Sequence, residues 1–173
     1  STLLNMIGLL DSITEGSIEK HGITHKMSLE SEYKITDVLK EFTDVLESSD
    51  MIVGHNIDFD RNVLMCEYSR NNLKNTMEYY DKMLMYCTMR NSIDVCKIKK
   101  EWPNGNVTYK WPTLEELHYT LFRNNPINLH NSLVDIFVTF RCFYKLKFDK
   151  DILRENVSLR SYYNELCQKS YKC

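Results

Sequence analysis

Two short stretches of the chain, set well apart, carry residues whose types and spacing suit hydrolytic chemistry. Residues 54–60 read GHNIDFD and residues 130–135 read HNSLVD. Asp60 and Asp135 supply two carboxylates, and His130 supplies an imidazole. Carboxylate oxygens bind hard cations such as Mg²⁺, and an imidazole can take a proton from a water molecule. Together the two stretches predict metal-assisted attack on a phosphodiester.

The first stretch is expected to lie where a strand gives way to a helix. Residues 51–54 (MIVG) indicate a short buried strand, and a helix follows to about residue 71. Asp60 would lie one turn into that helix, at the carboxyl end of the strand, where α/β sheets place their ligand sites. We expect Phe59 to anchor the helix in the core. Asp58, about 200° around the helix from Asp60, is expected to point to solvent.

The second stretch opens a helix that runs to about residue 146. Asn131 or Ser132 caps it, His130 lies in the loop before it, and Asp135 lies one turn inside it. Asp135 has apolar neighbours, so we expect it to be partly buried, and a metal is a suitable partner for a buried carboxylate. The alternative for both acids is an ordinary solvated residue at a helix start. The core face of this helix is predicted to consist of Leu133, Ile136, Phe137, Phe140 and Tyr144.

The other predicted elements alternate between strands and helices. A helix over residues 36–47 places its apolar side chains on one face, a strand covers residues 83–89, and residues 102–106 form a loop. Residues 91–100 are either helical or irregular. Thr113 caps a further helix, and residues 147–173 form one or two terminal helices. This alternation predicts an α/β fold. The apolar face of the first helix is expected to comprise Val38, Leu39, Phe42, Val45 and Leu46.

The composition limits the possible classes of protein. A chain of 173 residues fits one domain. Its net charge of −2 gives no overall attraction to nucleic acid, so any contact with nucleic acid needs a local patch or bound metal.

The six cysteines form no C-x-x-C pair, which favours free thiols in a reducing, intracellular compartment such as the cytoplasm, the nucleus or a viral factory. No apolar run is long enough to span a membrane. The lack of alanine is typical of an AT-rich genome, for example that of a large DNA virus.

The two stretches lead to a known family. The chain resembles the DEDD superfamily of 3′–5′ exonucleases, in the DEDDh subgroup that includes the proofreading subunit of bacterial replicative polymerase and ribonuclease T. HNIDFD matches the second motif of that family, HNSLVD matches the third, and HGIT at residues 21–24 matches a recurrent turn. The resemblance covers about residues 17–146. It implies an RNase H-like mixed sheet flanked by helices over residues 1–146, with residues 147–173 as a C-terminal helical extension.

The resemblance also implies roles for particular residues. It implies two Mg²⁺ or Mn²⁺ ions and a substrate that is the 3′ end of single-stranded DNA or RNA. A polymerase or another replication or repair protein is an expected partner. The implied metal ligands are Asp60 and Asp135, the implied general base is His130, and the implied product-side cleft is shaped by His55, Asn56 and Phe59.

One family motif is not evident in the chain. The first motif, Asp-x-Glu-Thr on an opening strand, would supply two further carboxylates for the metals. Asp11 and Glu15 are the nearest candidates, but their spacing differs from the motif. We therefore expect the opening strands to be missing. The alternative is a degenerate exonuclease fold that does not cleave and serves as a nucleic-acid- or protein-binding module.

A basic and aromatic stretch over residues 97–111 is a weaker candidate. It could stack on and grip single-stranded nucleic acid. The alternative is an exposed loop with tryptophans packed in the core, in which Trp111 and Pro112 anchor the following helix. His118, on that helix, is expected to be structural. The residues of this stretch are Lys97, Lys99, Lys100, Trp102, Tyr109, Lys110 and Trp111.

Overall fold

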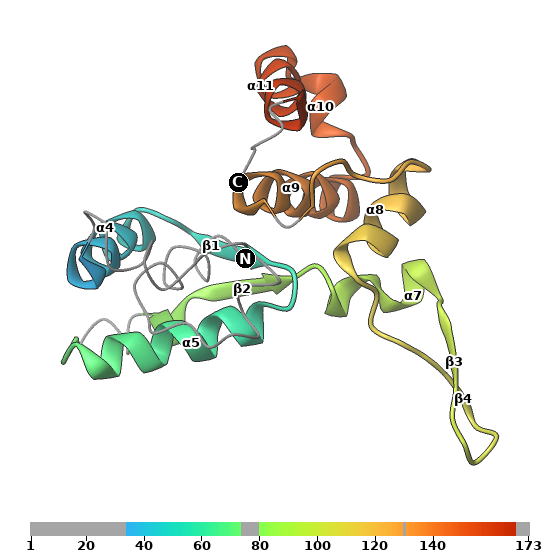
Figure 1. The fold of residues 1–173 in the computed structure, drawn as a ribbon, viewed down its shortest axis with the longest axis horizontal. Coiled ribbons are helices and arrows are strands. Elements are labelled where there is room, and N and C mark those ends of the chain that lie inside the picture. Colours follow the sequence, from blue (N-terminus) through green and yellow to red (C-terminus); the bar gives the residue numbers. More distant parts are fainter. Residues whose placement is uncertain (1–33, 74–79, 130, 169–173) are drawn as a thin grey trace.

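The fold is a mixture of helices and short strands, seen in a computed structural model that describes residues 34–73, 80–129 and 131–168. The predicted alternation of strands and helices is confirmed for these residues. Figure 1 shows the elements in chain order: α4 (Ile35–Glu47), β1 (Met51–Gly54), α5 (Ile57–Arg70), β2 (Leu84–Cys87), η1 (Arg90–Ser92), α7 (Ile93–Cys96), β3 (Lys99–Glu101), β4 (Val107–Tyr109), α8 (Leu114–Phe122), α9 (Ser132–Phe148), α10 (Ile152–Glu155) and α11 (Val157–Gln168).

Strands β1 and β2 pair in parallel, with Met51 opposite Leu84 and Gly54 opposite Cys87. Parallel strands need a crossover connection, and α5 lies in the segment that joins them. Helices α4 and α5 share one apolar cluster, inside which the Thr43 hydroxyl lies 2.9 Å from the Tyr68 hydroxyl. The buried members of this cluster are Leu39, Leu46, Leu64, Tyr68 and Tyr80.

Helix α5 buries the predicted Leu64 and Tyr68 but not the residue predicted for its first turn. Phe59 is 52% exposed, so it is not the expected core anchor, and Ile57 is 1% exposed in its place. Asn56, in the left-handed conformation with φ of 65°, sets the start of the helix directly before Ile57. Ile57 and Phe59 then lie about 200° apart around the helix, so only one of them can face the core. In α4, Val45 is likewise exposed although its neighbour Leu46 is buried.

A second apolar cluster joins α8, α9 and α11. Its buried residues include Val134, Val138 and Cys142, which recur every four residues along α9. The predicted inward face of α9 is wrong for Leu133, Ile136 and Phe140, which are exposed, whereas the predicted Phe137 packs against this cluster. Helix α9 is apolar on most sides, so its sequence does not single out the face that α8 and α11 cover. The predicted terminal helices are confirmed as α10 and α11.

Strands β3 and β4 form an antiparallel hairpin that projects away from the helices (Figure 1). The predicted loop at residues 102–106 is confirmed as its turn, closed by the Gly105 amide donating to the Trp102 carbonyl, 2.9 Å away. Gly105 takes a φ of 80°, which suits a glycine after a type I turn. The flanking strands were not predicted, because each has only three residues and KKE contains no apolar side chain.

The five cysteines in the described part of the chain are free thiols. Among these residues, no helix combines the length and apolar character needed to cross a membrane.

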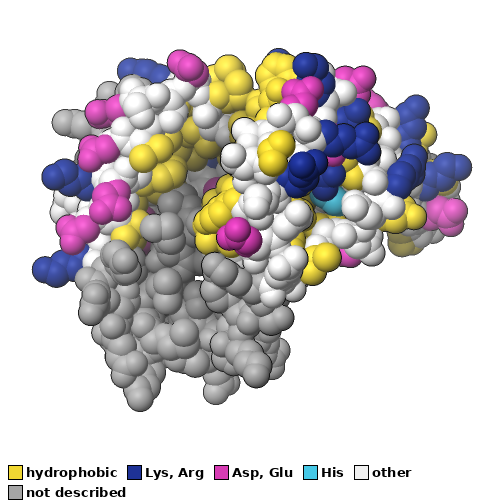
Figure 2. Space-filling model, turned by 90° about the horizontal axis from the view of Figure 1, so that it is seen from above, with side chains coloured by type: hydrophobic (Ala, Val, Ile, Leu, Met, Phe, Trp, Pro, Cys, Tyr) yellow, Lys and Arg dark blue, Asp and Glu magenta, His cyan; other side chains and the backbone are white. Residues whose placement is uncertain are grey.

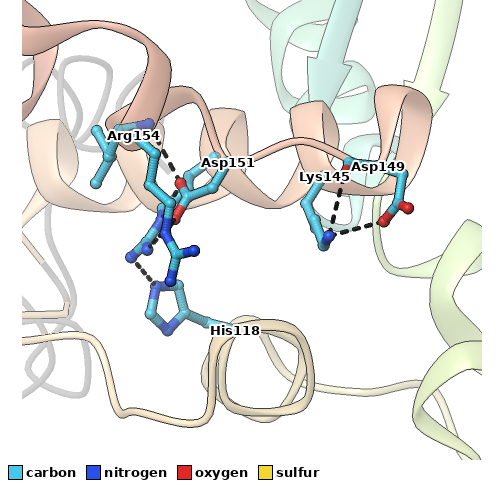
Figure 3. Close-up of polar contacts among 7 residues, drawn as sticks. His118, Lys145, Asp149, Asp151 and Arg154 are labelled. Carbon is cyan, nitrogen blue, oxygen red and sulfur yellow. Dashed lines mark hydrogen bonds and ion pairs between the residues drawn. The ribbon is translucent and has the colours of Figure 1, made fainter.

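A largely buried ion pair, with its two side chains 13% and 10% exposed, joins α8, α9 and the start of α10 (Figure 3). The Arg141 guanidinium donates from Nε and Nη2 to the two Asp151 carboxylate oxygens at 2.9 and 2.7 Å. Its Nη1 donates to His118 Nε2 at 3.0 Å, so His118 carries its proton on Nδ1, which donates to the Asn124 carbonyl at 2.9 Å. His118 is buried, as a structural role predicts.

We predict that Asp151→Asn lowers the free energy of unfolding by about 3 kcal/mol, because it leaves the Arg141 charge buried without its counter-ion. Urea unfolding followed by circular dichroism measures this. Asp149→Asn is the matched control. Asp149 pairs with Lys145 at the surface, where ion pairs contribute little, and asparagine tolerates its φ of 55°. Equal losses in both variants would contradict a special contribution from the buried pair.

A second prediction concerns pH. Burial, together with the nearby Arg141 charge, holds the pKa of His118 below its ordinary value of 6.5. The unfolded chain therefore takes up a proton that the folded protein does not, as the pH falls through about 6.5, and stability falls with it. We expect the free energy of unfolding to decline from pH 7.5 to pH 5.5, by at most about 1.4 kcal/mol per pH unit for each such histidine.

The decline should be shallower in His118→Gln, which keeps an acceptor toward Arg141 but does not titrate. His55, whose pKa burial also lowers, accounts for part of the remaining slope. Asp151 enters only at lower pH: burial opposes its ionisation, but the Arg141 hydrogen bonds keep its pKa lowered. An unchanged slope in His118→Gln would contradict the prediction.

Candidate functional site

A cavity of about 820 Å³ lies where the carboxyl end of β1 meets α4, α5, α8 and α9. Hydrophobic side chains gather around a hollow on the face of the molecule shown in Figure 2. Asp60 and Asp135 both line the cavity. Two carboxylates 75 positions apart in the sequence therefore line the same cavity.

Each of these carboxylates belongs to the first turn of a helix. Asp60 is the fourth residue of α5 and Asp135 the fourth residue of α9. The Asn131 side chain caps α9 by accepting from the Leu133 and Val134 amides at 3.1 and 3.3 Å, which confirms one of the two predicted caps. The positive end of a helix dipole stabilises an acid at this position. Both carboxylates are half-buried, and Asp60 Oδ1 is buried from solvent.

A third acid reaches the same cavity from a third helix start. Glu115, in the first turn of α8, belongs to its lining. The Thr113 hydroxyl accepts from the Glu116 amide at 3.2 Å, and the Glu116 carboxylate accepts from the Thr113 amide at 2.8 Å. This reciprocal pair is the capping box that fixes the first turn of α8. The predicted cap at Thr113 is confirmed, and it positions one wall of the cavity.

Tyr80 is a cavity residue that the sequence did not single out. It is buried beside the carboxylate of Asp60. Burial, reinforced by the negative charge of Asp60, raises the pKa of Tyr80 to about 12. The phenol therefore stays protonated at neutral pH and presents a hydroxyl rather than a second negative charge next to Asp60. Residues 79 and 80 are both tyrosines without a periodic pattern, so the sequence held no signal for this role.

His55 holds the walls of the cavity together. Its Nε2 donates to the Pro112 carbonyl at 3.1 Å, and its Nδ1 lies 3.0 Å from the Thr88 hydroxyl. Burial lowers the pKa of His55, although the hydrogen bond to Pro112 opposes this. A neutral imidazole matches the geometry, with Nδ1 accepting from Thr88. His55 therefore links the ends of β1 and β2 to the segment that leads into α8.

The remaining predicted residues lie elsewhere. Asn56 and Phe59, predicted to shape the same cleft as His55, are exposed and lie outside the cavity lining. Asp58 points to solvent as expected, where its carboxylate pairs with Arg90 at 3.1 Å. His130, Asp11 and Glu15 lie outside the described residues.

The lining of the cavity is otherwise mainly apolar. Ile136 and Phe140 of α9, assigned to the core by the sequence, contribute to this wall. Within residues 34–73, 80–129 and 131–168, no group of three or more His, Cys, Asp and Glu side chains is placed to hold a metal ion. The described part of the site thus has three carboxylates, those of Asp60, Glu115 and Asp135, around a mostly apolar hollow. Two carboxylates suit a hard divalent cation, which takes further oxygen ligands from water or a phosphate.

Comparison with known families gives one match. The RNase_T family model, described as Exonuclease, matches residues 7–143. The matched range contains Asp60, His130 and Asp135, and it also contains Asp11 and Glu15. Neither the comparison with curated proteins nor that with solved structures gives a match.

We predict that Gly54→Ala disturbs the site from the backbone. A Cβ at this position would lie 3.1 Å from Ile57 Cβ and 3.2 Å from Ile57 Cγ1. Ile57 is buried and begins the helix turn that carries Asp60, so relief of this contact must shift that turn. We expect a loss of about 1–3 kcal/mol in unfolding free energy, measured in urea.

The double variant Gly54→Ala/Ile57→Ala tests the cause, because it removes Cγ1 from the crowded contact. Its loss of stability should be smaller than the sum of the two single losses. Additive losses would show that the Ile57 atoms beyond Cβ take no part in the contact.

Proposed function

The chain belongs to the RNase_T exonuclease family, and on this basis we propose that it is a metal-dependent 3′–5′ exonuclease of the DEDDh subgroup with an RNase H-like fold. Its substrate is the 3′ end of single-stranded DNA or RNA. The observation that carries the proposal is that Asp60 and Asp135, from two motifs far apart in sequence, line one cavity. A nuclease of this kind needs carboxylates that converge from separate elements.

The donor set fits a divalent metal in part. Asp60 and Asp135 are hard oxygen donors, which suit Mg²⁺ or Mn²⁺. When bound, such ions polarise the phosphate and lower the pKa of a bound water, and a pair of them clamps the attacking and leaving oxygens. The family match extends to Asp11 and Glu15, which we propose as the additional carboxylates that two ions require.

The protein's own residues would divide the remaining work. We assign His130 as the base that takes the proton of the attacking water. His55 and Thr88 fix the backbone around the cavity through their hydrogen bond. The neutral Tyr80 phenol lies beside Asp60 without adding charge. The apolar side chains of Ile136 and Phe140 offer a surface for the sugar and base of the terminal nucleotide and restrict water.

A second candidate function rests on the metal-ligand count. Within the described ranges, no three His, Cys, Asp and Glu side chains form a metal-binding group. If Asp11 and Glu15 do not complete the site, the chain would bind nucleic acid or a partner protein without cleaving. A partnership with a polymerase or another replication or repair protein fits either function.

We predict that Asp60→Asn and Asp135→Asn each lower the rate of 3′ shortening more than about a hundredfold. Metal coordination contributes several kcal/mol to the transition state, and each 1.36 kcal/mol is tenfold in rate. The measurement follows a 5′-labelled single-stranded oligonucleotide with Mg²⁺ or Mn²⁺ on a denaturing gel. His130→Gln should cost about 10²–10⁴-fold in the same assay.

Asp58→Asn is the matched control, because Asp58 lies two residues from Asp60 on the same helix but points to solvent. It should retain the wild-type rate. Products that shorten from the 5′ end, or a rate that survives both carboxylate changes, would contradict the proposed reaction. If the wild-type chain binds the oligonucleotide without shortening it, the non-cleaving function is correct.

A further inference from the structure

The β3–β4 hairpin is exposed over its whole length. Every residue from 99 to 109 is exposed, including two aromatic side chains, Trp102 at 45% and Tyr109 at 44%. Trp111, just beyond β4, is 60% exposed, so it does not anchor α8 in the core. A two-stranded hairpin without a packed face is marginally stable in water. Its aromatic residues are therefore not accounted for by packing within the chain.

Contacts within the hairpin hold one aromatic ring in place. The Trp102 indole Nε1 donates to the Thr108 hydroxyl across the two strands at 2.8 Å. The Lys100 ammonium lies 4.2 Å from the centroid of the same ring. On the opposite face of the ribbon, the register sets Lys99 directly across from Tyr109. Each face thus presents one lysine beside one aromatic ring.

The base of the hairpin is fixed to the wall of the cavity. The Lys110 amide donates to the Ile98 carbonyl at 2.9 Å, which extends the ladder by one step. The Lys110 ammonium pairs at 2.5 Å with Glu116, the residue that closes the capping box of α8. Pro112, two residues after Lys110, is buried, and its carbonyl accepts the hydrogen bond of His55. The base of the hairpin is therefore held to the segment that enters the cavity lining at Thr113.

The charge of the hairpin is opposite to that of the whole chain. Lys97, Lys99 and Lys100 are exposed beside a single acid, Glu101, whereas the chain carries a net charge of −2. The fourth lysine of this stretch, Lys110, is already paired with Glu116. A local excess of lysine on an acidic protein attracts a polyanion to that place.

We propose that the β3–β4 hairpin is a binding arm for single-stranded nucleic acid, which grips the strand outside the cavity that receives its 3′ end. The inference deepens the function proposed above and rests on it for the class of substrate. Trp102, Tyr109 and Trp111 would stack on unpaired bases, and Lys99 and Lys100 would contact phosphates. Stacking accepts any base, because each has a π-face, and lysine contacts carry no sequence information.

A single strand suits the hairpin better than a duplex. The bases of a duplex are stacked on one another, so their faces cannot receive exposed aromatic rings. The seven residues from 106 to 112 span about 20 Å when extended, at about 3.3 Å per residue. An arm of that length engages an oligonucleotide of several nucleotides or more and does not contact a mononucleotide held in the cavity.

The chain has two tryptophans, and both belong to this segment. Tryptophan fluorescence therefore reports on the hairpin directly. We would titrate the full chain with an oligothymidylate of about twelve nucleotides, within the usual site sizes of single-strand binders, in buffer with a metal chelator so that no cleavage occurs. Salt-dependent quenching is the expected result. Trp102→Phe and Trp111→Phe then assign the signal to one or both rings.

The variant Lys99→Glu/Lys100→Glu should weaken binding about tenfold or more and reduce the salt dependence. The matched control is Lys34→Glu/Lys40→Glu, which makes the same change in charge at two exposed lysines, one at the N-cap of α4 and one within that helix. The affinity of this control should stay within about twofold of wild type. Tyr109→Ser should also weaken binding by about tenfold. Thermal unfolding midpoints of all variants, compared with wild type, separate a binding defect from a folding defect.

Absence of quenching, or equal affinity in the two lysine pairs, would overturn the proposal. So would equal competition by a duplex of the same length or by polyglutamate, since either would show attraction of charge without stacking. Hydrolysis of a p-nitrophenyl ester of thymidine monophosphate by wild type and hairpin variants separates this inference from the function on which it rests. Quenching without any hydrolysis refutes only the proposed exonuclease activity. If the hairpin variants hydrolyse both the oligonucleotide and the ester as fast as wild type, only the proposed binding arm is refuted.

Discussion

The hydrogen bonds of the His55 imidazole are the constraint on which the site depends. Through Nε2 and Nδ1 they join the Pro112 carbonyl and the Thr88 hydroxyl, and so the ends of both parallel strands to the entry of α8. The Thr88 hydroxyl donates its single proton to Nδ1, and the Thr88 amide donates to the Gly54 carbonyl at 2.9 Å, which closes the contact on β1. The ring must stay neutral for Nδ1 to accept, and burial, which lowers the pKa of His55, favours that state. The cavity wall and the root of the hairpin are therefore linked by one half-buried side chain.

Around that point, three helices begin, and each carries an acid in its first turn: α5 with Asp60, α8 with Glu115 and α9 with Asp135. Helix starts are favourable places for carboxylates, because the helix dipole offsets part of the cost of concentrating negative charge. Apolar packing fixes each of these helices. Helix α5 belongs to the first apolar cluster, and α8 and α9 belong to the second. The positions of the carboxylates thus follow from the packing of two separate cores.

The sequence predicted those features of the site that are set locally. A short apolar strand, a histidine and a helix start placed Asp60 at the carboxyl end of β1, and Asn131 placed Asp135 in the first turn of α9. Features set by tertiary contacts were missed. The buried residue in the first turn of α5 was misjudged, because the left-handed Asn56 brings Ile57 rather than Phe59 to the core. No local pattern marked Tyr80, whose role depends on its burial beside Asp60. Asp11, Glu15 and His130 lie outside the described residues, so the predictions for them remain untested.

The electrostatics of the cavity explain why a nuclease with this site benefits from a separate binding surface. A cavity lined by three acids repels a phosphate backbone until cations are bound, so it cannot by itself supply the attraction that brings the substrate near. The attraction must come from positive charge placed outside the cavity yet fixed relative to it. Lys99 and Lys100 stand on a hairpin whose root is held by Glu116 and His55, at the edge of the cavity wall. Separation of the acids that act on the phosphate from the lysines that attract it also keeps the two sets from neutralising each other. An ion pair between them would remove the charge that each site needs.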